Sequence, residues 1–507
     1  MQLSKSEYMM FLRHPALLWF KKHDKSKLPP IDEDTQAMFD AGFVFETYAE
    51  QLFLDAVRLG FDSYQEYISL TRRTDQAIRG GAKTILQGRF EAGEITCICD
   101  ALVKVGENNF DLYEIKSSSA VKSDHEYDLA FQREVLEASG LKIDHIFVIH
   151  VNTEFVRNGE VRANELCKTV EVTEAVKARE IETRENIRCA IEMATSRECP
   201  DISPKYASRF ALGDWLEVYR KLVEVGEYSI YDLCGIDPEK IGMLESQAIQ
   251  NIKDIPEDFA LNERQLRQVV ATKSDEIFVD EQKVRSFLNE LKFPLYFLDY
   301  ETLSSVVPYF DGLSPYKQLP FQYSLHILAT PESELQHFEY LHDENSNPVR
   351  LLSETLKSQI GEVGTVLVWY QPFERTCNEL MGNLLPEFKD FYYALNDRIV
   401  DLMTPFAEGS YVDKRFLGSA SIKKVLPVLI PELSYIDLDI HAGGAAQRLW
   451  MEAVLDGKRA SEKDKILQDL WKYCELDTLA MVRIYQFLKK LQGDAKSRYI
   501  APQLPGF

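Results

Sequence analysis

The chain has 507 residues, too many for one ordinary domain, and 45% of them are hydrophobic, enough for a sizeable core. The formal net charge of −23 argues against a protein that coats nucleic acid along its surface, but not against an enzyme with a local basic groove. The eight cysteines form no Cys-x-x-Cys pair, and no secretory signal or membrane-length segment is evident, so we expect a cytoplasmic protein without membrane contacts.

The first 200 residues predict an α/β domain. Residues 1–80 have mostly helical spacing, and Ser4 is a suitable N-cap. The later elements are three strands between 84 and 118, a helix over 126–139 that Gly140 ends, a buried strand over 143–151 and a charged helix over 173–195. This strand–helix–strand order predicts a fold with the strands at its centre.

The rest of the chain predicts a helical connector over 201–285, a second α/β domain over 286–490 and a tail over 491–507. From residue 293 three strands follow one another, PLYFLDYE, FQYSLHILA and ELQHFEYLH. A helix over 348–360 and the strand TVLVWY come next. Three strands followed by alternating helices and strands fit a ribonuclease-H-like layout.

Two acids at the end of an apolar strand are the first candidate site residues. Asp299 and Glu301 are two residues apart, so their side chains share one face of the strand. Two carboxylates on one site repel each other unless a cation lies between them, and hard oxygen ligands suit Mg²⁺ or Mn²⁺. An exposed pair at a strand end is the alternative interpretation.

Further candidates follow along the second domain. Glu374 falls in the first turn of a helix that follows a strand, and Tyr473 and Asp477 are four residues apart on one helix face. Tyr473 is alternatively a core tyrosine. We expect Asp401 to be a structural acid, and Lys423 and Lys424 either to meet substrate phosphates or to form a solvated helix face.

These motifs, in this order, resemble the DEDD exonuclease superfamily (DnaQ-like), in the branch with tyrosine in its last motif. The departure is Glu374, where that superfamily normally has aspartate. The segments FLDYETLSSVVPYFDGL, RIVDLMTPF and GSASIKKVLPVLIPELSY also resemble an uncharacterised bacterial domain family over about 290–480, whose members usually have asparagine where Gln371 stands. The resemblance implies two-metal hydrolysis of phosphodiesters, with two Mg²⁺ or Mn²⁺ ions held by Asp299, Glu301, Glu374 and Asp477 and with the attacking water oriented by Tyr473.

The first domain carries a second acidic pattern. Asp100 precedes Glu114 and Lys116, which share a strand face, and Gln132 lies on the next helix. This arrangement resembles the RecB-like branch of the PD-(D/E)XK nuclease superfamily (restriction-endonuclease-like fold), including CRISPR-associated RecB-type exonucleases, over about 1–200. The resemblance implies one or two ions bound by Asp100 and Glu114, with Lys116 positioning water.

Two motifs of that branch are changed here. Its QxxxY helix has leucine at position 136, and its GxxxHxxxE motif appears as Gly42, Glu46 and Glu50, with Glu46 in the histidine position as a candidate metal ligand. This site is therefore either active or degenerate.

Relatives in this branch often hold an iron–sulfur cluster on four cysteines. In this chain His14 stands where such proteins often have the first cysteine, and the segment CPDISPKYASRFALGDW, which begins at residue 199, offers only Cys199. We therefore expect no cluster, and we expect His14 to be a surface residue.

Together these observations favour a two-domain, metal-dependent nuclease. The second domain would be a 3′–5′ exonuclease acting on DNA or RNA that is single-stranded or has a free 3′ end. One alternative is an inactive scaffold that binds nucleic acid or protein, and another is an enzyme that hydrolyses short oligonucleotides. The sequence leaves the oligomeric state open.

Overall fold

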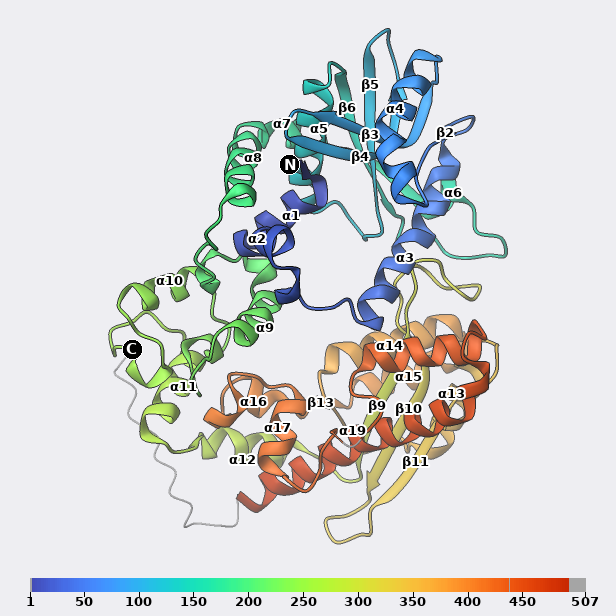
Figure 1. Ribbon diagram of the computed structural model, residues 1–507. Coiled ribbons are helices and arrows are strands. Elements are labelled where there is room, and N and C mark those ends of the chain that lie inside the picture. Colours follow the sequence, from blue (N-terminus) through green and yellow to red (C-terminus); the bar gives the residue numbers. More distant parts are fainter. Residues whose placement is uncertain (1, 437, 492–507) are drawn as a thin grey trace. The chain divides into compact units, whose positions relative to one another are not determined.

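The computed structural model describes residues 2–436 and 438–491, which form two compact units (Figure 1). Unit 1 comprises the chain up to Glu224 together with Asp237–Glu239 and Ser305–Tyr316, and unit 2 comprises Val225–Ile236, Lys240–Ser304 and the chain from Lys317 onward. Both units contain helices and a mixed sheet, which confirms the predicted α/β class. The predicted tail lies outside the described residues, apart from residue 491.

In the described part of unit 1 the strands form one seven-stranded sheet in the order β2-β3-β4-β5-β6-β7, with β1 paired to β4. The strands are β1 (Leu3–Ser4), β2 (Val57–Arg58), β3 (Thr84–Ala92), β4 (Ile95–Lys104), β5 (Asn109–Lys116), β6 (Lys142–Val151) and β7 (Cys167–Glu171). Strands β3, β4 and β5 are antiparallel neighbours, whereas β6 runs parallel to β5 after the crossover helix α5 (Ser123–Ala138). The predicted strand–helix–strand order is thus confirmed.

The described part of unit 1 also contains nine α-helices, several of which pack on this sheet. They are α1 (Lys5–Arg13), α2 (Pro15–His23), α3 (Glu33–Ala49), α4 (Tyr64–Arg79), α5, α6 (Ala163–Leu166), α7 (Thr173–Ala178), α8 (Glu180–Thr195) and α9 (Leu212–Leu222). Helix α5 packs on β3, β4 and β6, and its Leu136 is fully buried in the core with Tyr8 and Phe131. The single helix predicted over 173–195 is wrong in one respect, because it is divided at Arg179.

The segment 305–316 packs within unit 1, although it joins two strands of unit 2. Val306 lies in a hydrophobic cluster with Phe45 and Ile149. The Arg157 guanidinium donates to the Tyr309 carbonyl over 2.9 Å. The chain therefore leaves the sheet of unit 2 and returns to it by way of unit 1.

Unit 2 is built, within its described residues, on a five-stranded sheet in the order β11-β10-β9-β12-β13. Its strands are β8 (Phe278–Val279), β9 (Leu295–Leu303), β10 (Leu319–Leu328), β11 (Gln336–Leu341), β12 (Thr365–Val368), β13 (Ile399–Asp401) and β14 (Tyr411–Val412), the first and last of which pair separately. Strand β9 is antiparallel to β10 and parallel to β12. Within the five-stranded sheet the three consecutive strands β9, β10 and β11 therefore come first along the chain, as predicted.

The helices of this part of the chain are α10 (Pro238–Ser246), α11 (Glu263–Ser274), α12 (Glu281–Glu290), α13 (Val349–Gln359), α14 (Gln371–Leu384), α15 (Lys389–Asn396), α16 (Thr404–Ala407), α17 (Ile422–Leu429), α18 (Gly443–Trp450) and α19 (Lys463–Leu491). The long α19 runs along β9 and β10 (Figure 1). The region 201–285, predicted as a helical connector, contains several helices and also strand β8, and its residues divide between the two units.

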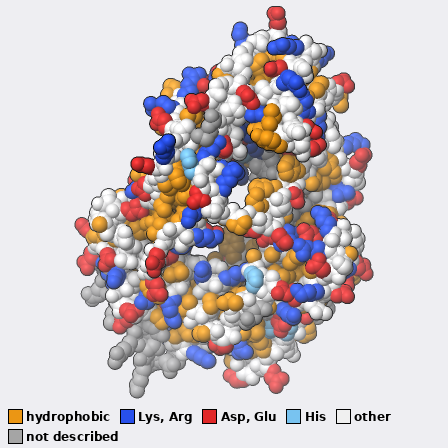
Figure 2. All heavy atoms as spheres, in the orientation of Figure 1, with side chains coloured by type: hydrophobic (Ala, Val, Ile, Leu, Met, Phe, Trp, Pro, Cys, Tyr) orange, Lys and Arg blue, Asp and Glu red, His pale blue; other side chains and the backbone are white. Residues whose placement is uncertain are grey.

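Two further features are the distribution of charged side chains on the surface and the hydrophobicity of the helices. Acidic and basic side chains are interspersed over the face shown in Figure 2, so the negative net charge is not gathered there in one patch. No helix among the described residues combines the length and the apolar character that crossing a bilayer demands.

Candidate functional site

The structure brings the four predicted acids of unit 2 together. Asp299 and Glu301 lie on β9, Glu374 on the first turn of α14, and Asp477 on α19. One carboxylate oxygen from each of Asp299, Glu301 and Asp477 lies within 4.8 Å of the others. Glu374 is 1% exposed and close enough to Asp299 for the two charges to interact. Strand β9, the start of α14 and the long helix α19 thus bring these acids together. We call Asp299, Glu301, Glu374 and Asp477 the acidic centre.

None of the described residues forms an ion pair with these four carboxyls, although the charge of Lys423 acts on Asp299, Glu301 and Asp477 from nearby. Burial, followed by the repulsion of the neighbouring acids, raises the pKa of Asp299, of Glu301 and of Glu374 well above the ordinary range. Burial raises the pKa of Asp477 to about 6. Glu374 Oε2 is buried and has no hydrogen-bond partner among the described residues. A divalent cation satisfies both the charges and the orphaned oxygen, so the donor set fits a hard metal ion.

Two tyrosines and a lysine border the acids. Tyr435 donates a 2.6 Å hydrogen bond to Asp477 Oδ1, and Lys423 Nζ donates to the Tyr473 hydroxyl over 3.1 Å. Lys423 Nζ also lies 5.6 Å from the ring centroid of Tyr435 and 5.3 Å from that of Tyr473. Burial and the nearby acids raise the pKa of Tyr473, so its hydroxyl stays protonated. Lys424, the other predicted lysine, is exposed.

A buried aspartate fixes the start of α14 and with it Glu374. Asp401 Oδ1 accepts from the Tyr370 backbone N–H over 3.0 Å, and Oδ2 accepts from that of Gln371 over 2.9 Å. Tyr370 has a φ of 82°, which an L residue adopts only when its surroundings hold it there. Asp401 therefore has the structural role predicted for it.

The residues predicted in unit 1 also meet. Gln132 on α5 donates to Glu114 Oε2 over 2.6 Å, and Lys116 Nζ lies 2.7 Å from Glu114 Oε1. Asp100 on β4 accepts from the backbone N–H of Ile115 over 2.7 Å. The predicted constellation is thus assembled across β4, β5 and α5.

Sequence reasoning missed two members of this cluster. Lys5, at the start of α1, places its Nζ 2.8 Å from Glu114 Oε1, and Asp128 Oδ2 lies 2.6 Å from Lys116 Nζ. Asp128 precedes Gln132 by one helical turn and its Oδ1 accepts from the Gln132 amide, a spacing that the sequence does display. No local pattern indicates Lys5.

The two acidic centres differ in their charge balance. Burial by itself would raise the pKa of Glu114, but Lys116 and Lys5 hold it well below its ordinary value. Burial and the charge of Glu114 raise the pKa of Asp100 to about 7. In unit 1 the protein's own ammonium groups therefore occupy the position beside Glu114 that a metal ion would need.

Glu46 lies at the edge of the unit 1 cluster. Its carboxylate accepts a hydrogen bond from the Gln87 side chain, and burial followed by the charge of Glu50 raises its pKa. Glu50 itself is paired with Arg58. The altered GxxxHxxxE motif is thus held by local partners.

The surface position predicted for His14 is wrong. His14 is fully buried and stacks on Trp215 with ring centroids 3.8 Å apart. Its Nδ1 accepts from the Ala16 backbone N–H, so Nε2 carries the proton and donates to the Ser203 carbonyl over 3.0 Å. A neutral imidazole with both nitrogens bonded is well accommodated in a core, whereas the prediction had treated His14 only as the residue at a vacated ligand position.

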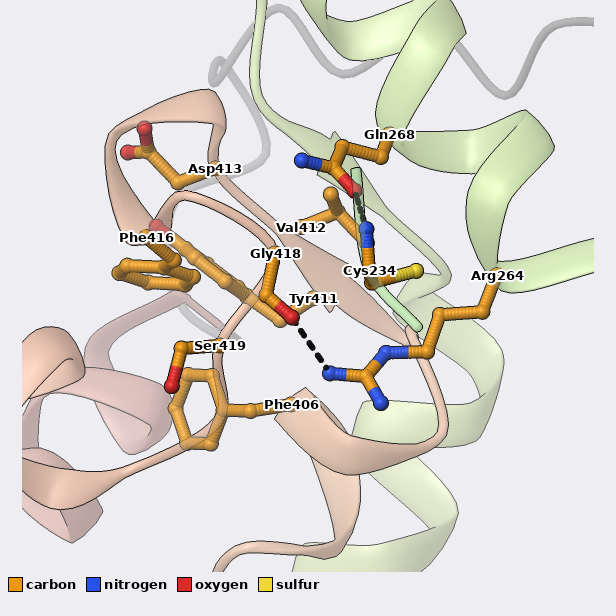
Figure 3. A pocket seen from close by; sticks show the side chains of 10 residues that line it. All are labelled: Cys234, Arg264, Gln268, Phe406, Tyr411, Val412, Asp413, Phe416, Gly418 and Ser419. Carbon is orange, nitrogen blue, oxygen red and sulfur yellow. Dashed lines mark hydrogen bonds between the residues drawn. The ribbon is translucent and has the colours of Figure 1, made fainter. Parts of the chain in front are cut away.

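A small cavity in unit 2 contains none of the predicted site residues (Figure 3). Its volume is about 20 Å³, enough for a single water molecule. Beside it Arg264 donates to the Gly418 carbonyl over 3.0 Å, and the Gln268 side chain accepts from the Cys234 N–H over 2.8 Å. The first bond ties α11 to the segment after β14 and the second ties α11 to Cys234, so the residues around the cavity have a structural role.

Comparison with known proteins places this centre partly inside a recognised domain. The family model described as Domain of unknown function (DUF2779) matches residues 296–421, which include Asp299, Glu301 and Glu374. This agrees with the predicted resemblance to an uncharacterised bacterial family, over a shorter range. The DnaQ-like and RecB-like resemblances stay predictions.

The relatives found are uncharacterised proteins. Uncharacterized protein MG366 from Mycoplasma genitalium is 26% identical over 241 residues, 44% of this chain and 36% of that protein. Its homolog from Mycoplasma pneumoniae is 25% identical over 225 residues, and Uncharacterized protein UU173 from Ureaplasma parvum is 23% identical over 249 residues. The former alignment covers 41% of this chain and 34% of the relative, and the latter 45% and 35%. The matched part of this chain thus spans about a third of each curated relative's length.

Proposed function

We propose that unit 2 is a metal-dependent nuclease with a ribonuclease-H-like (DnaQ-like) fold, which hydrolyses phosphodiester bonds of DNA or RNA from a 3′ end. The observation that carries the proposal is the acidic centre itself. Four acids from β9, α14 and α19 are drawn together without an ion-pair partner among the described residues, and one of their oxygens is orphaned. A protein gains nothing in stability from such a centre unless it binds cations there.

Asp299, Glu301, Glu374 and Asp477 would hold two Mg²⁺ or Mn²⁺ ions. Bound there, the ions would supply Lewis-acid stabilisation of the attacking and leaving oxygens of the phosphodiester. Tyr435 supports this donor set, because its hydrogen bond fixes one oxygen of Asp477 and leaves the other free.

Tyr473 would orient the attacking water. Its oxygen already accepts a hydrogen bond from Lys423, and none of the described residues accepts its own proton, so that proton is available to water or to a substrate oxygen. Lys423 supplies positive charge next to this hydroxyl, where phosphate oxygens arrive. Tyr473 and Lys423 are thus a positioning pair beside the acids.

A second proposal concerns unit 1, in which we place a restriction-endonuclease-like PD-(D/E)XK fold with a degenerate site. Lys5 and Lys116 already neutralise Glu114, and Gln132 occupies its second oxygen. The residues present therefore do not fit a metal ion well, and we derive no hydrolytic step for them. Unit 1 would bind nucleic acid as a scaffold while unit 2 cleaves it.

The test is a nuclease assay on the full chain with Mn²⁺ and end-labelled single-stranded DNA or RNA. The variants are Asp299→Asn in unit 2, Lys116→Ala in unit 1, and Asp397→Asn as a matched control on an exposed aspartate of unit 2. We expect stepwise shortening from the 3′ end that is lost in Asp299→Asn by at least about 100-fold and retained in the other two. A dinucleotide substrate, run in parallel, separates a nuclease from an enzyme specific for short oligonucleotides.

Two outcomes would contradict these proposals. No cleavage of either polymer by the unaltered protein would exclude the nuclease and favour a binding scaffold. Loss of cleavage in Lys116→Ala, with Asp299→Asn fully active, would move the catalytic site to unit 1. Mn²⁺ binding measured on each variant shows whether a lost activity reflects a lost ion.

A further inference from the structure

Three metal-ligating side chains meet at a second place in unit 2. His326 on β10 and His337 on β11 are directly opposite each other in the antiparallel pair, with ring centroids 4.3 Å apart. Glu475 reaches them from α19, and one ligand atom from each of the three lies within 4.8 Å of the others. Glu475 projects from a different face of α19 than Tyr473 and Asp477, because it is two residues away from each. This group is therefore separate from the acidic centre.

A hydrogen-bond chain connects the two imidazoles. Thr478 Oγ1 is 2.8 Å from His326 Nδ1 and 2.7 Å from Ser324 Oγ, and Ser324 Oγ is 2.9 Å from His337 Nε2. Thr478 Oγ1 also donates to the Glu475 backbone carbonyl over 3.1 Å. All four bonds lie within one turn of α19 and two paired strands.

The carbonyl at the end of this chain fixes every proton in it. A carbonyl only accepts, so the Thr478 hydroxyl donates to it and must accept from both Ser324 and His326. The Ser324 proton is then used, so His337 Nε2 must donate to Ser324. His326 is thus protonated on Nδ1 and His337 on Nε2.

This assignment leaves one ring nitrogen of each histidine with a free lone pair. No hydrogen bond among the described residues uses His326 Nε2, and His337 Nδ1 lies 3.8 Å from Glu475 Oε1. Two acceptor nitrogens and a carboxylate without a proton among them are suited to bind a cation.

We propose that His326, His337 and Glu475 form a binding site for one transition-metal ion of the Zn²⁺ class. Two imidazole nitrogens and one carboxylate oxygen are ligands that Zn²⁺ prefers, whereas Mg²⁺ and Ca²⁺ favour all-oxygen sites. Each histidine holds its second nitrogen in a hydrogen bond, as metal-ligating histidines usually do.

Binding requires a small closure of the three ligands. Metal–ligand bonds of about 2.0–2.2 Å place tetrahedral ligand atoms roughly 3.5 Å apart, so the group must contract and the stacked rings must turn about their Cβ–Cγ bonds. The Glu475 side chain is 49% exposed and that of His337 is 23% exposed, so these two can move toward the buried His326. A water molecule would complete the coordination from the solvent side.

The site would fasten α19 to the β10–β11 pair. Glu475 is two residues from both Tyr473 and Asp477, so an ion that fixes Glu475 also fixes the turn of α19 that presents them. The metal site is nonetheless independent of the proposed nuclease activity, because its ligands are not those of the acidic centre.

The experiment is a Zn²⁺ titration of the full chain against a chromophoric chelator, with Co²⁺ absorption as a second readout of nitrogen ligation. It is performed on a background of Asp299→Asn and Glu301→Gln, which removes ion binding at the acidic centre, and on the unaltered chain. We expect one Zn²⁺ per chain on the Asp299→Asn and Glu301→Gln background, at least one on the unaltered chain, and a Co²⁺ spectrum typical of imidazole ligands.

Variants of the ligands and their support test the assignment. Glu475→Gln and His337→Asn should each abolish stoichiometric Zn²⁺ binding, and Thr478→Val should weaken it by about 10–100-fold because the His326 ring loses its partner. Glu379→Gln, on an exposed glutamate of α14, should leave it unchanged. A thermal melting curve recorded without metal serves as the control that each variant is folded.

The proposal fails if the unaltered chain binds no Zn²⁺. It also fails if binding disappears with the acidic-centre substitutions and survives Glu475→Gln and His337→Asn, since the ion would then belong to the acidic centre. Neither result depends on whether the protein cleaves nucleic acid.

Discussion

At the scale of single residues, His14 shows how a titratable side chain can serve a core. Its imidazole caps α2 through Nδ1, donates through Nε2 and stacks on Trp215. All three interactions use the neutral ring. The protonation of one side chain therefore affects the packing of α1, α2 and α9.

This residue predicts a pH dependence of unit 1 stability. Burial lowers the pKa of His14 from 6.5 to about 4, so the unfolded chain binds a proton that the folded chain excludes between these values. The His14 contribution is then complete above pH 6.5 and is lost as the pH falls toward 4, by up to about 3 kcal/mol. Denaturant unfolding of the original protein and of His14→Asn from pH 7 to pH 4 measures this, and parallel pH profiles would contradict it.

Gly364 predicts a steric effect on the sheet of unit 2. It has a φ of 97°, and a Cβ built there would lie 2.1 Å from the Pro294 carbonyl oxygen. Gly364→Ala should lower the free energy of unfolding by about 2–5 kcal/mol, because left-handed strain and a backbone clash add. Gly457→Ala is the control, since its φ is 68° but nothing lies within 4 Å of the added carbon, so it should cost only about 1–2 kcal/mol. Equal losses would show that the clash is relieved by movement.

At the scale of elements, local spacing predicted much of both sites. The i, i+2 pair Asp299 and Glu301 and the i, i+4 pair Tyr473 and Asp477 need only strand and helix geometry. Lys5 and Tyr435 were missed because they reach their partners across 109 and 42 residues of chain, and no local pattern records such a contact.

The boundaries of helices are also only partly predictable from local sequence. The predicted helix over 173–195 is interrupted at Arg179, whose φ of −89° and ψ of −5° stay near helical values. The apolar periodicity hardly changes across such a break, so the sequence does not reveal it. Helix α5, by contrast, ends where predicted because Gly140 adopts a φ of 93°.

The cap of α1 predicts an effect on the unit 1 cluster. Ser4 accepts from the Glu7 N–H and Glu7 accepts from the Ser4 N–H, and Lys5 is the next residue after the cap. Ser4→Ala should cost about 1 kcal/mol and loosen the Lys5–Glu114 ion pair. Hydrogen exchange of residues 112–118 should therefore rise. Ser63→Ala removes the corresponding cap of α4 and should leave that exchange unchanged; an equal rise in both variants would contradict the specific link to Lys5.

At the scale of the whole molecule, sequence order and spatial order diverge. The residues that join β9 to β10 belong to unit 1, and Tyr316 donates to the carbonyl of Ser117, the residue after Lys116. The apolar pattern of the β9–β10 region indicated one continuous domain over 286–490. Local periodicity does not reveal such an excursion, because an apolar residue such as Val306 fits the core of either unit.

This excursion predicts that a substitution between two strands of unit 2 destabilises unit 1. Val306 is 5% exposed in the cluster that contains Phe45, so Val306→Asp buries an unpaired charge and should lower the stability of unit 1 by about 3–5 kcal/mol. Hydrogen exchange should increase across β5 and β6 and stay nearly unchanged in β12. Val363→Asp is the control, because Val363 is 67% exposed in unit 2 and tolerates the charge. If Val306→Asp instead increased exchange first in β9, β10 and β12, the segment would stabilise unit 2, and the division of the chain would have to be redrawn.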